Sequence, residues 1–276
     1  MGPADAAIIC CYTLGSLGGI LGLFPRWQSL RKPSAWAIAA GFMLHTASIA
    51  GVFLTGDVED LTKGAILRLM AWSLVFVYCV TWWRLRFSFL GITAGPLALV
   101  LFLASGAARN VSGGLPPMMT GAFFFLHLSV LFLNLALVTL GLGSALYFLS
   151  LHRKLKAKTV FMDSNGGNTP ALATVDRLNK YVVLAGFPLF TIGLVTGFAW
   201  AEFARGAVFT ADPKEIASVL LWLLYAFVFM QRAVFGVQGK KAAAMLVVLF
   251  FAMLFSLVGV NVFMDSHHNL FRSGMF

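Results

Sequence analysis

Charged residues and cysteines are both scarce in this sequence. Asp, Glu, Lys and Arg make up 11% of the 276 residues, against roughly 25% in soluble domains. Cys10, Cys11 and Cys79 lie inside apolar runs and form neither a CxxC nor a CxxCH motif, so no thiol redox site and no covalent haem attachment are predicted. There is no P-loop or other nucleotide motif, and we predict neither an energy-coupling site nor an enzymatic activity.

Long apolar runs dominate the rest of the sequence. Hydrophobic residues account for 60% of it, and the mean hydropathy is +0.89. A membrane-spanning helix needs about 20 mostly apolar residues, and eight runs meet this requirement. They cover residues 6–24, 35–55, 65–83, 87–105, 120–149, 181–201, 215–232 and 242–263. The sequence predicts an all-α, polytopic integral membrane protein of about eight transmembrane helices, with the lipid bilayer as its surroundings and residues 1–276 as one transmembrane domain.

The residues before the first apolar run include no Lys or Arg, and Asp5 is their only charged side chain. A secretory signal peptide begins with a basic region, so we expect the first run to be retained as a span.

The charged residues alternate between the two sides of these spans. One set of loops holds 14 of the 20 basic residues: Arg26, Arg31, Lys32, Arg84, Arg86, Arg153, Lys154, Lys156, Lys158, Arg177, Lys180, Arg232, Lys240 and Lys241. The opposite loops and the termini hold 8 of the 10 acids: Asp5, Asp57, Glu59, Asp60, Glu202, Asp212, Glu215 and Asp265. Basic loops face the cytoplasm, so both termini are predicted outside. This pattern explains the net charge of +10 without a nucleic-acid partner.

Two connections are long enough to be described by themselves. A cytoplasmic loop is predicted over residues 152–180, with a turn-rich run from Asp163 to Pro170. An external strip is predicted over residues 198–215, between spans six and seven. Span five is long for one crossing, and we expect its outer end to project past the hydrocarbon.

A helix start is predicted inside the external strip. Asp212 suits the N-cap, Pro213 suits the first helical position, and Glu215 stands three residues after the cap, with Lys214 between them. On local grounds this stretch, Asp212-Pro213-Lys214-Glu215, is a structural motif.

The histidines differ in their predicted depth. His45 lies near the middle of span two, where a polar group indicates a functional site or a neutral imidazole bonded to a neighbouring helix. His127 lies in the outer part of span five, and His268 follows span eight on the same side. His267, next to His268, is an alternative to it as a ligand. His152 begins a basic loop on the opposite side and is read as solvated.

Several of these residues together resemble the CcsA/HemX-like (WWD-type) cytochrome c assembly family. The family carries an external segment of the form WGxxWxWDPKE, followed by a helix with Trp and Tyr at fixed spacing. The corresponding residues here are Trp200, Gly206, Asp212-Pro213-Lys214-Glu215, Trp222 and Tyr225. Family histidines match His45 and His127, and a terminal GVN…H pattern matches Gly259-Val260-Asn261 with His268. The resemblance covers span two to the C-terminus, and the short chain is similar to the HemX-type branch.

The sequence departs from the family pattern at four positions. Arg205, Phe209 and Ala211 stand where the family has tryptophans. Met230 stands at the second membrane histidine. A thioether can ligate haem iron, although an ordinary lipid-facing or core methionine is the other reading of Met230.

The resemblance implies a haem-binding protein that presents non-covalent, b-type haem at an external site. His127 and His268 would ligate the iron, Trp200 and Phe209 would contact the porphyrin, and Arg205 and Lys214 would pair with the propionates. Asp212 and Glu215 would hold the strip, and His45, with Met230, would form a deeper site. Implied partners are haem, other cytochrome c assembly proteins and an apocytochrome. The implied location is the bacterial cytoplasmic (inner) membrane, with the strip on the periplasmic side.

Two other functions remain open from the sequence. A non-catalytic HemX-like regulator or assembly partner without stable haem binding would tolerate the altered aromatic strip. A transporter of small solutes or ions is the third reading, against which stand the few acidic residues within the spans and the absence of obvious paired broken helices.

Overall fold

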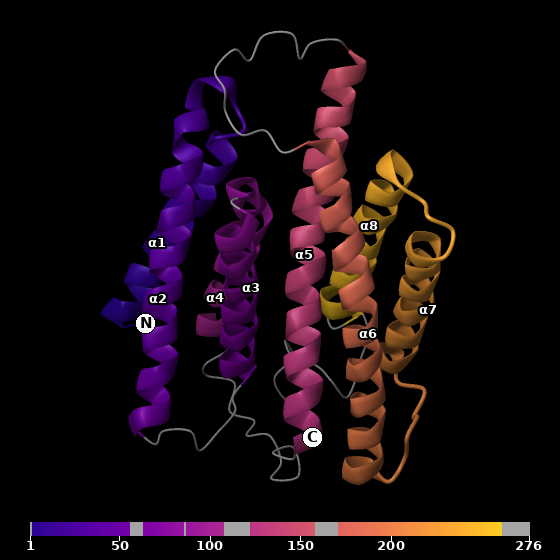
Figure 1. Cartoon of the computed structure of the whole chain (residues 1–276). Helices are drawn as coiled ribbons and strands as arrows, with labels where there is room; N and C mark the ends of the chain where they lie inside the picture. The colour runs from indigo at the N-terminus through magenta and orange to yellow at the C-terminus, as the bar shows by residue number, and fades with distance from the viewer. Residues whose placement is uncertain (1, 56–62, 86, 108–121, 158–170, 261–276) are drawn as a thin grey trace.

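The fold of the chain comes from a computed structural model, which describes residues 2–55, 63–85, 87–107, 122–157 and 171–260 (Figure 1). The described residues contain helices and no strand. The long helices are α1 (Pro3–Leu21), α2 (Arg31–Thr55), α3 (Lys63–Leu85), α4 (Gly91–Ala107), α5 (Ala122–Lys156), α6 (Leu172–Arg205), α7 (Pro213–Ala233) and α8 (Gly239–Leu254). Short 3₁₀ turns precede α2 (Pro25–Leu30) and α4 (Ser88–Leu90), and a π-helical turn follows α8 (Phe255–Gly259).

Eight helices in this part of the chain are long and apolar enough to cross a membrane. This confirms the all-α, eight-span prediction, and the observed spans lie close to the predicted runs. Helices are the expected solution, because a helix satisfies its own backbone hydrogen bonds where no water is present. The outward orientation of the termini and the single transmembrane domain over residues 1–276 stay predictions.

The helices pack as two neighbouring groups (Figure 1). Helices α1 to α4 contact one another, and α5 to α8 do the same. Helix α5 also packs against α3 and α4, so it joins the two groups. It is the most buried span: 72% of its most apolar stretch is buried inside the protein, and the corresponding share does not exceed 50% in any other span. Side chains on α5 are therefore held by neighbours on several sides.

Helix α5 is longer than the hydrocarbon region requires. Its 35 residues rise about 52 Å at 1.5 Å per residue, against a hydrocarbon thickness of about 30 Å. The helix begins at Ala122 and continues to Lys156, seven residues beyond the predicted end of this span. The seven additional residues therefore lie at the basic end of the bundle (top of Figure 1), and the projection of the other end past the hydrocarbon stays a prediction.

Helix α6 corrects the predicted cytoplasmic loop. It begins at Leu172, so residues 172–180 are helical and the predicted loop over 152–180 was too long. The stretch folds as a helix because its inner face is packed. Val175 is fully buried, and Asp176 is tied to Arg232 of α7 and to the backbone N–H of Gly239.

The C-terminal end of α6 shortens the predicted external strip. The helix runs to Arg205 and ends at Gly206, whose φ of +70° is the left-handed conformation typical of a helix C-terminus. The Gly206 N–H donates to the Glu202 carbonyl at 2.8 Å. Only residues 206–212 therefore form an irregular connection before α7, and within it Ala211 also has a positive φ of +58°.

Candidate functional site

The candidate site lies at the end of the bundle opposite the basic loops, where α5, α6 and α7 meet. His127 is in the second turn of α5 and faces α6 across a close contact. Its Nδ1 lies 2.6 Å from the Gly193 carbonyl oxygen. A carbonyl oxygen only accepts hydrogen bonds, so Nδ1 carries the hydrogen. In the neutral ring this leaves the Nε2 lone pair as the available ligand, as in most metal-binding histidines, which donate their other N–H to a carbonyl or carboxylate.

A glycine on α6 makes room for this imidazole. A Cβ added at Gly197 would lie 2.6 Å from Cε1 and 2.8 Å from Nδ1 of His127. Real Cβ atoms essentially never approach a neighbour this closely. Gly193 and Gly197 are one helical turn apart on α6, so one supplies the hydrogen-bond acceptor and the other supplies the space. The ring is therefore fixed against the α6 backbone.

The start of α7 is the helix start that the local sequence predicts. Asp212 is the N-cap residue, and its Oδ1 accepts a hydrogen bond from the Lys214 N–H at 2.8 Å. Pro213 occupies the first helical position, where a missing N–H costs nothing. Asp212 is only 5% exposed, so its carboxylate is bound up in the cap.

Glu215 closes the irregular connection that precedes this helix. Its carboxylate accepts hydrogen bonds from the Thr210 backbone N–H at 2.7 Å and from the Thr210 hydroxyl at 3.1 Å. The contact differs from a standard capping box, in which the Glu at this position binds the N–H of the N-cap residue. Asp212, Pro213 and Glu215 together hold the loop at the start of α7, where Lys214 is the second helical residue.

The aromatic residues of the predicted site have different environments. Trp200 is buried in α6, with 8% of its surface exposed. Phe209 is 52% exposed and makes an edge contact with Phe198, with ring centroids 6.3 Å apart. Phe209 is therefore accessible to a ligand, whereas Trp200 is enclosed by protein. Arg205 ends α6, but its side chain lies outside the described residues, as do His267 and His268.

His45 and Met230 are not brought together. His45 is fully buried: its Nδ1 lies 3.0 Å from the Tyr12 hydroxyl, and its ring makes an edge contact with Phe102 at 4.9 Å. These contacts place it in the group α1 to α4. Met230 is 43% exposed on α7. Met230 lies on the same exposed face of α7 as Leu223 and Phe227, because residues three or four apart share one face of a helix. The predicted deeper pair does not form.

The two histidines differ in their fit to haem. The donor arrangement at His127 suits an iron ligand, since one ring nitrogen is fixed and the other keeps its lone pair. His45 has no exposed surface and is enclosed by Tyr12 and Phe102, so a porphyrin does not fit over it in this conformation. Its Nε2 has no hydrogen-bond partner among the described residues. Within those residues, no group of three His, Cys, Asp or Glu side chains could hold a metal ion.

Several buried polar residues escape the sequence prediction. Asn134 of α5 is fully buried, and the Tyr225 hydroxyl donates to its Oδ1 at 3.4 Å. Arg68 of α3 forms an ion pair with Asp5 of α1 at 2.9 Å. Each of these polar residues interrupts or borders an apolar run, and this interruption is the only indication of them in the sequence. Their partners lie on helices far away in sequence and could not be read from it.

The C-terminal part of the predicted site follows the π-helical turn Phe255–Gly259. Such turns inside or at the end of α-helices are frequent at functional sites. Gly259 permits this one, because an added Cβ would lie 2.5 Å from the Phe255 ring. Val260 follows the turn and is the last of the described residues, so Asn261 lies outside them.

Comparisons with known proteins identify the family of this chain. The family model described as Cytochrome C assembly protein matches residues 62–268. The chain is 27% identical to the cytochrome c biogenesis protein CcsA of Chlamydomonas reinhardtii over 210 residues, covering 74% of this chain and 58% of the relative. It is 26% identical to CcsA of Microcystis aeruginosa over 249 residues, covering 74% and 76%. It is 26% identical to CcsA of Thermosynechococcus vestitus over 286 residues, covering 89% of both.

A solved structure shows the same fold. The cytochrome c haem lyase CcmF superposes with a TM-score of 0.62 at 15% sequence identity, over 99% of this chain and 48% of that one. The chain thus spans about half the length of CcmF, and at this identity the likeness concerns the fold alone. The family match extends over most of the sequence and ends at His268, which confirms the predicted resemblance. The chain belongs to the cytochrome c assembly protein family.

Proposed function

We propose that this multi-pass membrane protein of cytochrome c biogenesis handles haem at a histidine-ligated site on the outer ends of α5 and α6. The observation that carries the proposal is the 2.6 Å contact from His127 Nδ1 to the Gly193 carbonyl oxygen. It fixes the tautomer and orientation of the ring and leaves the Nε2 lone pair as the available ligand. Haem, held non-covalently as a b-type group, would supply an iron for which neutral imidazole is a common ligand.

His268 would be the second residue to hold the haem iron. It lies outside the described residues, but the family match extends to this position. The π-helical turn Phe255–Gly259 ends two residues before Asn261, and His268 stands seven residues after Asn261 in the sequence. His267 is the alternative ligand, and the two are separated by testing each variant.

Residues around His127 would bind the porphyrin and its propionates. The backbone of Lys214 is positioned by the Asp212 cap, next to the Glu215 contact, and its ammonium would pair with a propionate. Phe209 offers an exposed apolar ring. Arg205, at the end of α6, would supply a second cation for a carboxylate. Trp200 is enclosed, so in this proposal it supports the α6 end and does not form the porphyrin surface.

The proposal includes a location and a mode of action. The basic loops place the His127 end outside, on the periplasmic side of a bacterial inner membrane. The protein would bind and present haem to an apocytochrome or another assembly protein and would not form bonds itself. His45 would stabilise the group α1 to α4 through Tyr12, in place of the deeper haem site that the sequence predicts.

The absorption spectrum of protein purified in mild detergent tests this proposal. We expect a Soret band in the wild type that is lost in His127→Ala and in His268→Ala. His152→Ala is the matched control, because that ring stacks on Phe148 at the basic end of the bundle and should leave the band unchanged. A band that persists in both His127→Ala and His268→Ala would refute the assignment. If no band appears even when haem is supplied during expression, the regulator or assembly-partner function takes its place.

A further inference from the structure

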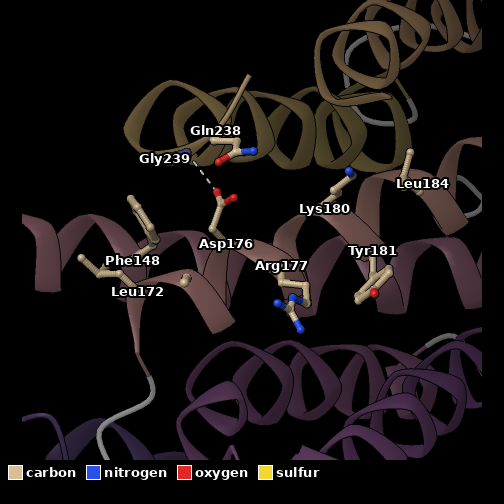
Figure 2. Close-up of a pocket in the computed structure, with 10 residues that line it drawn as sticks. Phe148, Leu172, Asp176, Arg177, Lys180, Tyr181, Leu184, Gln238 and Gly239 are labelled. Carbon is tan, nitrogen blue, oxygen red and sulfur yellow. Dashed lines mark hydrogen bonds between the residues drawn. The ribbon is translucent and has the colours of Figure 1, made fainter. Parts of the chain in front are cut away.

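A groove of about 770 Å³ lies at the basic end of the bundle, far from the histidine site (Figure 2). It is bordered by the first turns of α6, the start of α8 and Phe148 of α5. This is the side on which the sequence concentrates its basic residues, so the groove lies at the level where helix ends meet lipid headgroups.

The lining of the groove carries unbalanced positive charge. Arg177 and Lys180 of α6 are both exposed, and neither has an ion pair or a hydrogen bond from its side chain among the described residues. Asp176 is the one carboxylate among the residues that line the groove. It accepts hydrogen bonds from Arg232, at 3.3 Å and 3.4 Å, and from the Gly239 N–H at 3.0 Å. The neutralised Asp176 leaves the two cations available to an anion.

The same groove has apolar walls. Phe148, Leu172 and Leu184 line it, and Tyr181 is 60% exposed beside them. Figure 2 shows Lys180 and Leu184 on the side of α6 toward α8, with Arg177 and Tyr181 projecting from its other side. Arg177 and Lys180 are three residues apart, so their Cβ atoms are neighbours on the helix surface. Both side chains are long and exposed, and a headgroup bound by both would require the Arg177 side chain to turn from its present direction toward Lys180.

We propose that this groove binds the phosphate headgroup of an anionic phospholipid, with Arg177 and Lys180 as its charged ligands. A free phosphate would satisfy the cations alone, whereas a lipid also covers the Leu184 and Tyr181 surface with its acyl chain. Basic pockets between transmembrane helices on the cytoplasmic side bind acidic headgroups in this way. The proposal rests on the groove and does not depend on haem binding.

Native mass spectrometry of the full chain, titrated in detergent with phosphatidylglycerol or phosphatidylcholine, tests the proposal. We expect the first phosphatidylglycerol to bind more tightly than phosphatidylcholine. Arg177→Gln/Lys180→Gln should weaken that binding about thirty-fold, equivalent to about 2 kcal/mol, since each cation contributes about half of it. The matched control is Arg153→Gln/Lys156→Gln, which removes the same charge from exposed positions at the same end but outside the groove.

Three outcomes would overturn the proposal. An equal loss in the control variant would show that diffuse surface charge, and not the groove, attracts the lipid. An unchanged affinity in the groove variant would exclude Arg177 and Lys180. Displacement of the lipid by millimolar inorganic phosphate would assign the site to a soluble anion. Both variants change exposed residues, and a thermal unfolding curve checks that each protein is folded. His127→Ala should leave lipid binding unchanged, which separates this result from the haem test.

Discussion

Gly197→Ala is the sharpest test of the histidine site. The added methyl group changes the space that the His127 ring occupies and leaves His127 itself unchanged. The added Cβ would lie 2.6 Å from His127 Cε1, whereas ordinary van der Waals contact begins near 3.4 Å. The ring must therefore move by roughly 0.8 Å relative to α6. A shift of that size along the Nδ1 contact would lengthen the 2.6 Å hydrogen bond to Gly193 to about 3.4 Å, beyond the usual range.

The expected consequences of this shift differ for haem affinity and for stability. Losing the partner that orients a metal-binding histidine lowers affinity about 10- to 100-fold. Overpacking costs about 1–3 kcal/mol, and alanine gains up to about 1 kcal/mol over glycine within a helix, so part of the loss in folding free energy is offset. We therefore expect weaker haem binding in a protein that still folds, which a thermal unfolding curve checks.

Haem titration of the apoprotein, followed by Soret absorbance, measures the affinity of Gly197→Ala beside the wild type. Gly51→Ala is the matched control, since nothing lies within 4 Å of a Cβ added at that position in α2. The control should bind haem normally. The reasoning fails if Gly197→Ala binds haem as tightly as the wild type while His127→Ala does not bind it. The ring would then ligate iron without needing its contact to α6.

Two further predictions concern the contacts that hold the bundle. Asp212→Ala should destabilise the protein by about 1 kcal/mol, because the Lys214 N–H at the start of α7 loses its cap. Asp212→Asn keeps a side-chain acceptor and should recover most of the loss in the same denaturation assay; equal losses in both variants would indicate that the cap is not the cause. Asp5→Ala should cost about 3–5 kcal/mol, because it leaves the largely buried Arg68 without its ion-pair partner. Asp5→Ala combined with Arg68→Met should recover part of that stability, and a double variant less stable than Asp5→Ala would contradict this account.

Much of the fold follows from local features of the sequence. Each spanning helix is long and apolar within one continuous run, so its existence does not depend on its neighbours. The same holds for the start of α7, where the cap and the proline act within four residues. The family resemblance was likewise visible in short motifs, and the match over residues 62–268 confirms it.

The candidate site depends on contacts between residues that are far apart along the chain. His127 could be named from the sequence, but its acceptor lies 66 residues away on α6, and only the packing of α5 against α6 brings them together. The packing also decided that His45 is enclosed by Tyr12 and Phe102 and that Met230 faces outward.

The sequence by itself determined the eight spans, the basic and acidic sides and the helix start at Asp212, because hydropathy, charge and capping act over one helix or less. The tertiary structure decided where α5 and α6 extend past those spans, which groups contact His45 and His127, and which cations of the basic groove remain without partners among the described residues. The physical reason is that a lone pair or a charge can bind a ligand only where no neighbouring helix already contacts it. Which helices are neighbours is decided by packing between segments that are far apart in the sequence.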